Sequence, residues 1–215
     1  MKTIKQTIIN ANQKKIIPIL LGDPPSHPRP SVFPAKAGIG MNSSEDRILD
    51  PFENTQGKLV ENDNRIDIIL AGENAEVEIW GLLTANGQQQ TALEVYITHA
   101  APNTKSNVNV RAVLTGKSSF TFRGNVKIEK GAKGADAYLR SDALLFDDAK
   151  MGDDTPALEI LEKDVKAGHA ATIGKVDENM LFYLMSRGLS RNQAEKLLIK
   201  GFISPILEKI KHEQS

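Results

Sequence analysis

The residue of this chain with the clearest capacity for chemistry is His169, which stands in the segment Gly168-His169-Ala170-Ala171-Thr172. A neutral imidazole nitrogen can bind a metal ion, and the ring changes charge near neutral pH. The small neighbours leave the ring sterically open. One interpretation is a metal ligand. The alternative is a histidine that is hydrogen-bonded at the end of a β segment.

The other histidines are weaker candidates. His99 follows an alternating segment that ends at Thr98, and we expect it to be packed or hydrogen-bonded at a strand end. No role is assigned to His27 or His212.

Two pairs of adjacent carboxylates, Asp147-Asp148 and Asp153-Asp154, suggest carbohydrate cleavage as a different chemistry. Glycoside hydrolysis needs two carboxyl groups across the bond that breaks, one of them with a raised pKa. Neighbouring residues of a strand point to opposite faces, and both pairs flank Lys150 and Gly152 in a predicted loop. We therefore predict that the four aspartates are solvated turn residues.

The sequence contains no cysteine. This excludes disulfides, thiolate nucleophiles and cysteine metal ligands within the chain. Any metal ion bound by this chain alone would therefore have nitrogen and oxygen ligands, without a thiolate.

Composition indicates an ordinary globular chain, since 215 residues suit one main domain or one with a small appendage. Apolar residues make up 40% and charged residues 25%, with zero net charge, so nothing favours nucleic acid or an anionic membrane as a partner. The longest apolar run, Ile16 to Leu21, contains Pro18 and is too short to cross a bilayer. We recognise no signal peptide and expect a cytoplasmic protein.

Four regions follow from the pattern along the chain. Residues 1–22 form an N-terminal strand region, and residues 23–62 form a proline-rich excursion that no regular ladder or helix should cross. Part of the excursion, residues 27–39, resembles a translated interspersed DNA repeat, with an ordinary linker as the alternative. Residues 63–176 are predicted to be β throughout, and residues 177–215 to be helical.

The central region alternates apolar and polar side chains with the period of two that a half-buried strand requires. Its clearest segments are residues 75–80, 93–97, 108–113 and 120–122. We expect turns at four glycines, Gly72, Gly87, Gly116 and Gly131. Short strands at near-constant spacing are typical of a sandwich, a barrel or a β-solenoid. Helical patterns do not intervene, which argues against a doubly wound α/β fold.

The carboxyl-terminal region predicts two short amphipathic helices. Asp177 is the expected cap of a first helix over residues 178–187, which Gly188 should end in the left-handed conformation. Residues 190–193 form a capping box for a second helix, which Pro205 is expected to break or kink. The two helices must bury their apolar stripes against the β body or against a partner.

Taken in order, several segments resemble the SufB/SufD family, the scaffold proteins of SUF iron–sulfur cluster assembly. The resemblance covers about residues 63–208 and is carried by residues 66–75, 99–107, 116–124, 130–132, 136–138, 155–160, 164–165, 169–174 and 181–189. The core of that family is a right-handed parallel β-helix. The resemblance therefore implies a mainly β fold, a right-handed parallel β-helix core with a small C-terminal α-helical subdomain.

The resemblance also implies a role as a non-enzymatic component of the scaffold. It implies pairing with a SufB/SufD-like protomer, as a homodimer or a heterodimer, near His169 and Thr172. His169 is then the candidate metal ligand, with an iron–sulfur cluster present transiently at the interface and no cofactor bound tightly by this chain alone. The terminal helices would dock the SUF ABC-type ATPase, with aromatic and Met residues as typical interface anchors. The candidate contacts are Phe182, Tyr183, Met185, Arg187, Leu198, Phe202 and Ile206.

The chain departs from the family pattern in two places. SufB-type members typically have a cysteine two positions before the histidine, where this chain has Ala167, and Ala170 replaces the usual following glycine. Without a thiolate the chain cannot supply the soft sulfur ligands that hold most iron–sulfur clusters. It therefore resembles the SufD type more than the SufB type, in an amino-terminally shortened form. Two other classes stay open: a β-helix carbohydrate-active enzyme with a carboxylate site, and a small β-domain binding module without a metal role.

Overall fold

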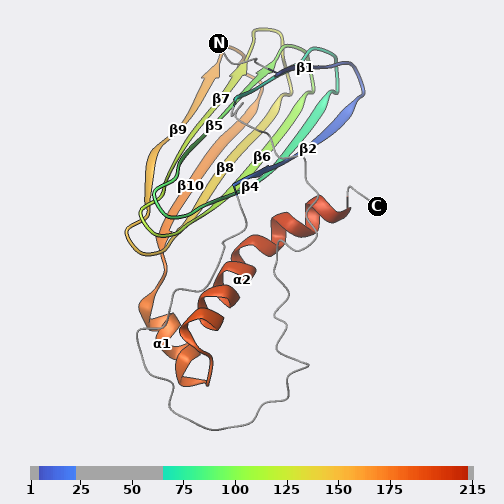
Figure 1. The fold of residues 1–215 in the computed structure, drawn as a ribbon. Coiled ribbons are helices and arrows are strands. Elements are labelled where there is room, and N and C mark those ends of the chain that lie inside the picture. Colours follow the sequence, from blue (N-terminus) through green and yellow to red (C-terminus); the bar gives the residue numbers. More distant parts are fainter. Residues whose placement is uncertain (1–4, 23–64, 213–215) are drawn as a thin grey trace.

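The computed structural model describes residues 5–22 and 65–212 (Figure 1). The excursion predicted for residues 23–62 lies outside the described residues. The described residues contain, in order, β1 Lys5–Ile9, β2 Lys14–Leu21, β3 Arg65–Leu70, β4 Glu76–Ala85, β5 Gln90–His99, β6 Lys105–Leu114, β7 Ser119–Ile128, β8 Asp136–Leu145, β9 Lys150–Ile160, β10 Lys166–Lys175, α1 Glu178–Ser186 and α2 Arg191–His212.

The strands wind into a parallel β-solenoid, which confirms the predicted β-helix. The odd-numbered strands form one five-stranded sheet and the even-numbered strands form another, each in sequence order (Figure 1). Every pairing is parallel and joins residues about one coil apart, as in Glu76 with Lys105, Lys105 with Asp136, and Asp136 with Lys166. Strands β1 and β2 pair with β3 and β4, so residues 5–21 belong to the same solenoid.

The near-constant coil length stacks side chains of one kind between the sheets. In the even sheet Ile79, Val108 and Leu139 are in register and fully buried. Alternating side chains point to opposite sides of a strand, so one set builds this core and the other faces outward. A solenoid core of this kind gains stability from each neighbouring coil.

The turns between strands fall at the four predicted glycines, Gly72, Gly87, Gly116 and Gly131. The turns also use polar residues in the left-handed conformation, which Asn and Asp tolerate best among residues with a side chain. These residues are Asn12, Asn74, Asn103 and Asp147. Asn74 donates a hydrogen bond to Asn12 of the preceding coil at 3.1 Å, so these turns also stack.

Gly124 of β7 faces the side chain of Leu139 in the opposite sheet, with no room between them for a further side chain. A Cβ atom at this position would lie 2.3 Å from Leu139 Cδ1 and 3.1 Å from Phe122 Cε1, inside the packed core. We expect Gly124→Ala to destabilise the protein by about 2 kcal/mol, because neither neighbour can move without displacing others. Denaturant unfolding measures this. Gly174→Ala, in a strand with open space around the new methyl group, should change stability little; equal losses for both variants would contradict the packing described.

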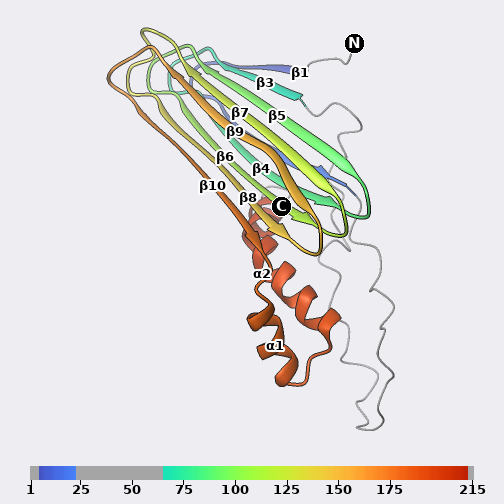
Figure 2. The ribbon, with the colours of Figure 1, turned by 90° about the vertical axis from the view of Figure 1, so that its left-hand side faces the viewer.

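Helix α2 packs on the outer face of the even sheet. Its apolar side chains form a second core with outward residues of β2, β4 and β6 and with Phe146 (Figures 1 and 2). The helical members of this core are Ile199, Ile203, Ile206, Leu207 and Ile210. The two views show α1 farther from the sheets than α2. None of the described helices is long and apolar enough to span a membrane.

The predicted helix caps are confirmed. Asp177 caps α1 by accepting a hydrogen bond from the Asn179 backbone N at 2.8 Å, and Gly188 has φ +98°. In the capping box of α2, the Ser190 backbone N donates to Gln193 Oε1 at 2.8 Å and the Gln193 N donates to Ser190 Oγ at 3.3 Å.

Pro205 was predicted to break or kink the second helix, and the break is wrong, because α2 continues through this residue. Proline has no N–H for the carbonyl four residues earlier, which here belongs to Gly201. Ser204 Oγ donates to that carbonyl at 3.3 Å instead. The neighbouring hydroxyl thus satisfies the group that Pro205 leaves unpaired.

A second correction concerns Asp153 and Asp154, which were predicted in a loop. They lie within β9, whereas Asp147 and Asp148 do lie in a turn. The two pairs therefore occupy different kinds of structure.

Candidate functional site

The last coil of the solenoid, β9 with β10, forms an open end. Each of these strands is the final one of its sheet, and within the described residues no strand pairs with its outer edge. Ile160, Leu161 and Ile173 of this coil are exposed although they are large and apolar. Unpaired edges and uncovered apolar side chains are typical of a surface that another chain covers.

His169 lies on β10 in this last coil. It is in register with Leu139, whose side chain is fully buried between the sheets. Gly168 faces the ring of Tyr138 on the outer side, so His169 points to the inner side. It is nevertheless exposed, because within the described residues no further coil covers it. The imidazole thus lies at the uncovered end of the core.

Asp154 of β9 lies at the same end. It is in register with the buried Phe122, and a bulge in β9 turns it to the inner side. Both carboxylate oxygens are shielded from solvent and, among the described residues, have no hydrogen-bond partner. Burial raises the pKa of Asp154, the charges of Asp153 and Asp142 raise it further, and His169 lowers it. The side chains of Asp154 and His169 are therefore close enough to interact electrostatically.

The buried carboxylate of Asp154 lowers the stability of the folded chain, and a single substitution can measure by how much. A raised pKa in the folded state means that ionised Asp154 lowers stability at neutral pH. We expect Asp154→Asn to stabilise the isolated chain by about 1 kcal/mol at pH 7 in denaturant unfolding. Asp153→Asn is the matched control, because Asp153 is exposed and lies 3.7 Å from Arg123. A loss of stability in Asp154→Asn would show that the carboxylate has a partner that the chain itself supplies.

Thr172 does not join His169. It is in register with Asp142 and points to the outer side of β10, where it is exposed. Asp142 itself is held by Arg140 at 2.8 Å and lies 3.8 Å from Arg111. Across residues 5–22 and 65–212, no group of three or more His, Cys, Asp or Glu side chains is arranged to hold a metal ion.

Helix α1 presents an exposed apolar surface, which we call the α1 face: Met180, Phe182, Tyr183 and Met185. Phe182 is 74% exposed and Tyr183 52% exposed. Arg187 lies beside this surface, with its guanidinium 5.3 Å from the centre of the Tyr183 ring. Leu181 is buried, so the helix is anchored on one side and free on the other.

The candidates on α2 are less available than those on α1. Ile206 is buried in the contact with the β body. Phe202 is half-buried, receives a hydrogen bond from Arg111 on its backbone carbonyl, and has the guanidinium 5.1 Å from its ring. Leu198 is half-buried. Helix α2 therefore packs on the β body, whereas α1 exposes its apolar side chains to solvent.

His99 is hydrogen-bonded and fully buried at the end of β5, as predicted. Its Nδ1 lies 2.8 Å from Thr104 Oγ1 and its Nε2 2.8 Å from Ser106 Oγ. The Thr104 hydroxyl donates to the Ala101 carbonyl, so it accepts from Nδ1–H, and Nε2 accepts from Ser106. Burial lowers the pKa of His99 to about 4.

Sequence reasoning did not identify Asp154, Met180 or Leu197 as site residues. Met180 and Leu197 are exposed apolar residues on helices. A helical projection of α1 would have found Met180, which lies three residues before Tyr183 and therefore on the same side of the helix. The inward direction of Asp154 depends on a bulge, for which the sequence has no distinctive signal.

The fold and these surfaces define a class of protein: a two-sheet parallel β-solenoid with an open end and a helical subdomain on one outer face. Residues 53–202 match the family described as SUF system FeS cluster assembly, SufBD core domain. The chain therefore belongs to the SufB/SufD family.

Curated relatives carry the same family names. The chain is 39% identical over 144 residues to an iron–sulfur cluster assembly SufBD family protein of Mycobacterium bovis, covering 67% of this chain and 17% of that protein. It is 35% identical over 141 residues to SufD of Bacillus subtilis, covering 66% of this chain and 32% of the relative. It is 36% identical over 146 residues to SufB of the same organism, covering 67% and 31%. The chain spans a third or less of the length of these relatives and matches SufB and SufD about equally.

Proposed function

We propose that this chain is a non-enzymatic component of the SUF iron–sulfur cluster assembly scaffold and acts in the cytoplasm. It pairs with a second SufB/SufD-like protomer through the open end of the solenoid and docks the SUF ABC-type ATPase through the α1 face. The observation that carries the proposal is the open last coil in a chain of this family, with unpaired edges, exposed apolar side chains and an imidazole at the end of the core.

Pairing at the open end is supported by the chemistry of β9 and β10. Within the described residues, the outer edges of both strands offer unpaired backbone N–H and C=O groups, and a second solenoid end offers the same groups. Ile160, Leu161 and Ile173 add apolar area to this surface. Covering the open end also stabilises the last coil, because a partner that binds only the folded chain raises its stability.

ATPase docking is supported by the α1 face. Aromatic and Met side chains are enriched in the cores of protein interfaces, and the α1 face consists of such residues. The α1 helix is capped at both ends and contacts α2, which itself packs on the β body. The face is therefore presented on a supported element.

In this proposal the cluster is the cargo of the complex. His169 supplies a nitrogen ligand at the protomer contact, and the partner protomer supplies the thiolates, since this chain has no cysteine. A partner that carries the cysteine ligands would make this chain the SufD-type subunit. A partner without them would make it the SufB-type subunit.

A single substitution tests the role of His169. We expect His169→Ala to leave the fold and the pairing intact and to lower the cluster yield about tenfold, a loss of the size that a disturbed metal site typically causes. The cluster yield is measured as visible absorbance after anaerobic reconstitution of the protomer pair with Fe²⁺ and sulfide.

Thr172→Ala is the matched control for that experiment, because Thr172 is exposed on the opposite side of the same strand. Its cluster yield should equal that of the unmodified pair. An unchanged yield in His169→Ala would remove His169 from the site. A loss confined to Thr172→Ala would move the site to the outer side of β10.

A further inference from the structure

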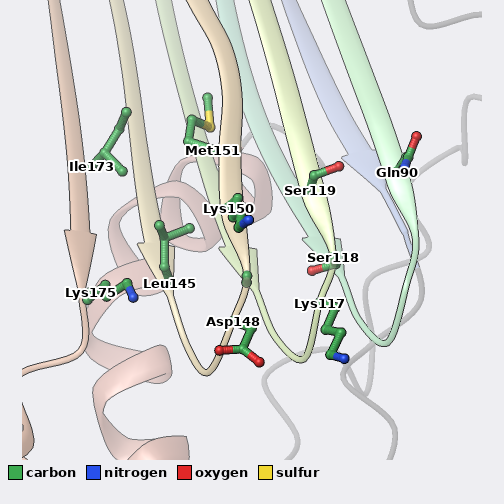
Figure 3. A pocket seen from close by; sticks show the side chains of 11 residues that line it. Gln90, Lys117, Ser118, Ser119, Leu145, Asp148, Lys150, Met151, Ile173 and Lys175 are labelled. Carbon is green, nitrogen blue, oxygen red and sulfur yellow. The ribbon is translucent and has the colours of Figure 1, made fainter.

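A pocket lies where the turns after β6 and β8 meet the end of β10, at the opposite end of the last coil from the turn 161–165 (Figure 3). Its volume is about 770 Å³, within the range of roughly 300–1,000 Å³ that is common for small-molecule sites. It is separate from the α1 face.

Three lysines from three different elements line this pocket. Lys117 comes from the turn after β6, Lys150 begins β9 and Lys175 ends β10 (Figure 3). Within the described part of the chain, none of these ammonium groups has an ion-pair partner. Among the described lining residues Asp148 is the one carboxylate. The pocket therefore has an excess of positive charge in a chain whose net charge is zero.

The remaining lining is apolar and neutral polar. Leu145, Met151 and Ile173 form the apolar part, and the Ser119 hydroxyl and the Gln90 amide add neutral groups (Figure 3). Met151 and Ile173 belong to the last coil, so the apolar part continues into the uncovered end of the core. A ligand that fits this lining carries several negative charges together with a less polar portion.

We propose that this pocket binds a small phosphorylated molecule. A phosphate or polyphosphate group carries two or more negative charges, which suits a pocket lined by three lysines, and lysine binds phosphate as a point charge. The concave shape favours a small molecule over the flat surface of an acidic protein. The less polar portion of the ligand lies on Leu145, Met151 and Ile173. The pocket shares Ile173 with the open end, so the proposal is tested on the isolated chain, and it does not depend on ATPase docking.

The probe for this proposal is inorganic pyrophosphate, titrated calorimetrically into the intact chain at low ionic strength. We expect saturable binding with one site per chain. The double substitution Lys117→Ala, Lys150→Ala should weaken binding about tenfold, since each partly exposed charge contributes a modest share. Raising the salt concentration should weaken binding to the unmodified chain, because mobile ions screen the lysines.

The matched control is Lys163→Ala, Lys166→Ala, which removes the same charge from exposed positions at the other end of the last coil. Its affinity for pyrophosphate should stay within twofold of the unmodified chain. Absence of saturable binding, or an equal loss in both double variants, would overturn the proposal. Tighter binding of citrate than of pyrophosphate would overturn the assignment to phosphate, and binding of a glutamate-rich peptide alone would mark the pocket as a protein contact.

Discussion

Replacing Phe182 and Tyr183 together by serine is expected to lower the affinity for the SUF ATPase about a thousandfold. Both side chains are largely exposed on α1, and buried aromatic anchors at an interface centre contribute about 2 kcal/mol or more each. The fold should survive, because Leu181 anchors the helix on its other side. The affinity is measured by titrating the purified ATPase into the labelled chain.

This double substitution tests docking more specifically than deletion of the C-terminal residues 177–215. Deleting residues 177–215 would also strip Ile199, Ile203 and Ile206 from the second core and expose the outer face of the even sheet. Ile8→Ser is a suitable control, because Ile8 is 58% exposed on β1 at the opposite end of the solenoid. Retained affinity in the double variant would refute docking through the α1 face.

Acidification from pH 7 to pH 4 is expected to remove about 3 kcal/mol of stability through His99 alone. The pKa of this buried imidazole is lowered to about 4 from the ordinary value of 6.5, and each pKa unit corresponds to about 1.4 kcal/mol. The unfolded chain therefore binds a proton at a pH where the folded chain does not. The stabilisation is complete above pH 6.5 and is lost as the pH falls toward 4.

The measurement compares the pH dependence of unfolding free energy in the unmodified chain and in His99→Gln. The variant loses hydrogen bonds to Thr104 and Ser106, so it is less stable at pH 7, but its stability should fall less steeply below pH 6.5. His169→Gln, which removes an exposed imidazole, should retain the steep fall. Parallel curves for all three proteins would contradict a neutral, buried His99.

Much of the fold could be predicted from alternation alone. The segments 93–97, 108–113 and 120–122 lie within strands, and 75–80 lies within β4 except for Ala75, because a half-buried strand imposes a period of two. Alternation could not separate a solenoid from a sandwich or a barrel, since each has one buried face per strand. That choice depended on the family resemblance. Residues 1–22 were predicted as a strand region, but the place of β1 in the solenoid could not be predicted, because its pairing with β3 is a tertiary contact.

The candidate site could be predicted less completely. His169 was identified by its type and its neighbours, but its position at the end of the core depends on β10 being the last strand of its sheet. Strict alternation would place Asp153 on the same side as Met151. The bulge opposite Phe120 and Phe122 places Asp154 there instead. Ile206 was included among docking residues because an apolar stripe does not reveal which partner covers it.

Copurification of the tagged chain from its native cell extract, followed by mass spectrometry, tests the central claim most directly. The account predicts recovery of a cysteine-bearing SufB/SufD family protein together with an ABC-type ATPase. Leu161→Asp, which places a charge on the open end, should lose the family protein and keep the ATPase. Recovery of neither protein from an extract that contains both would contradict the account.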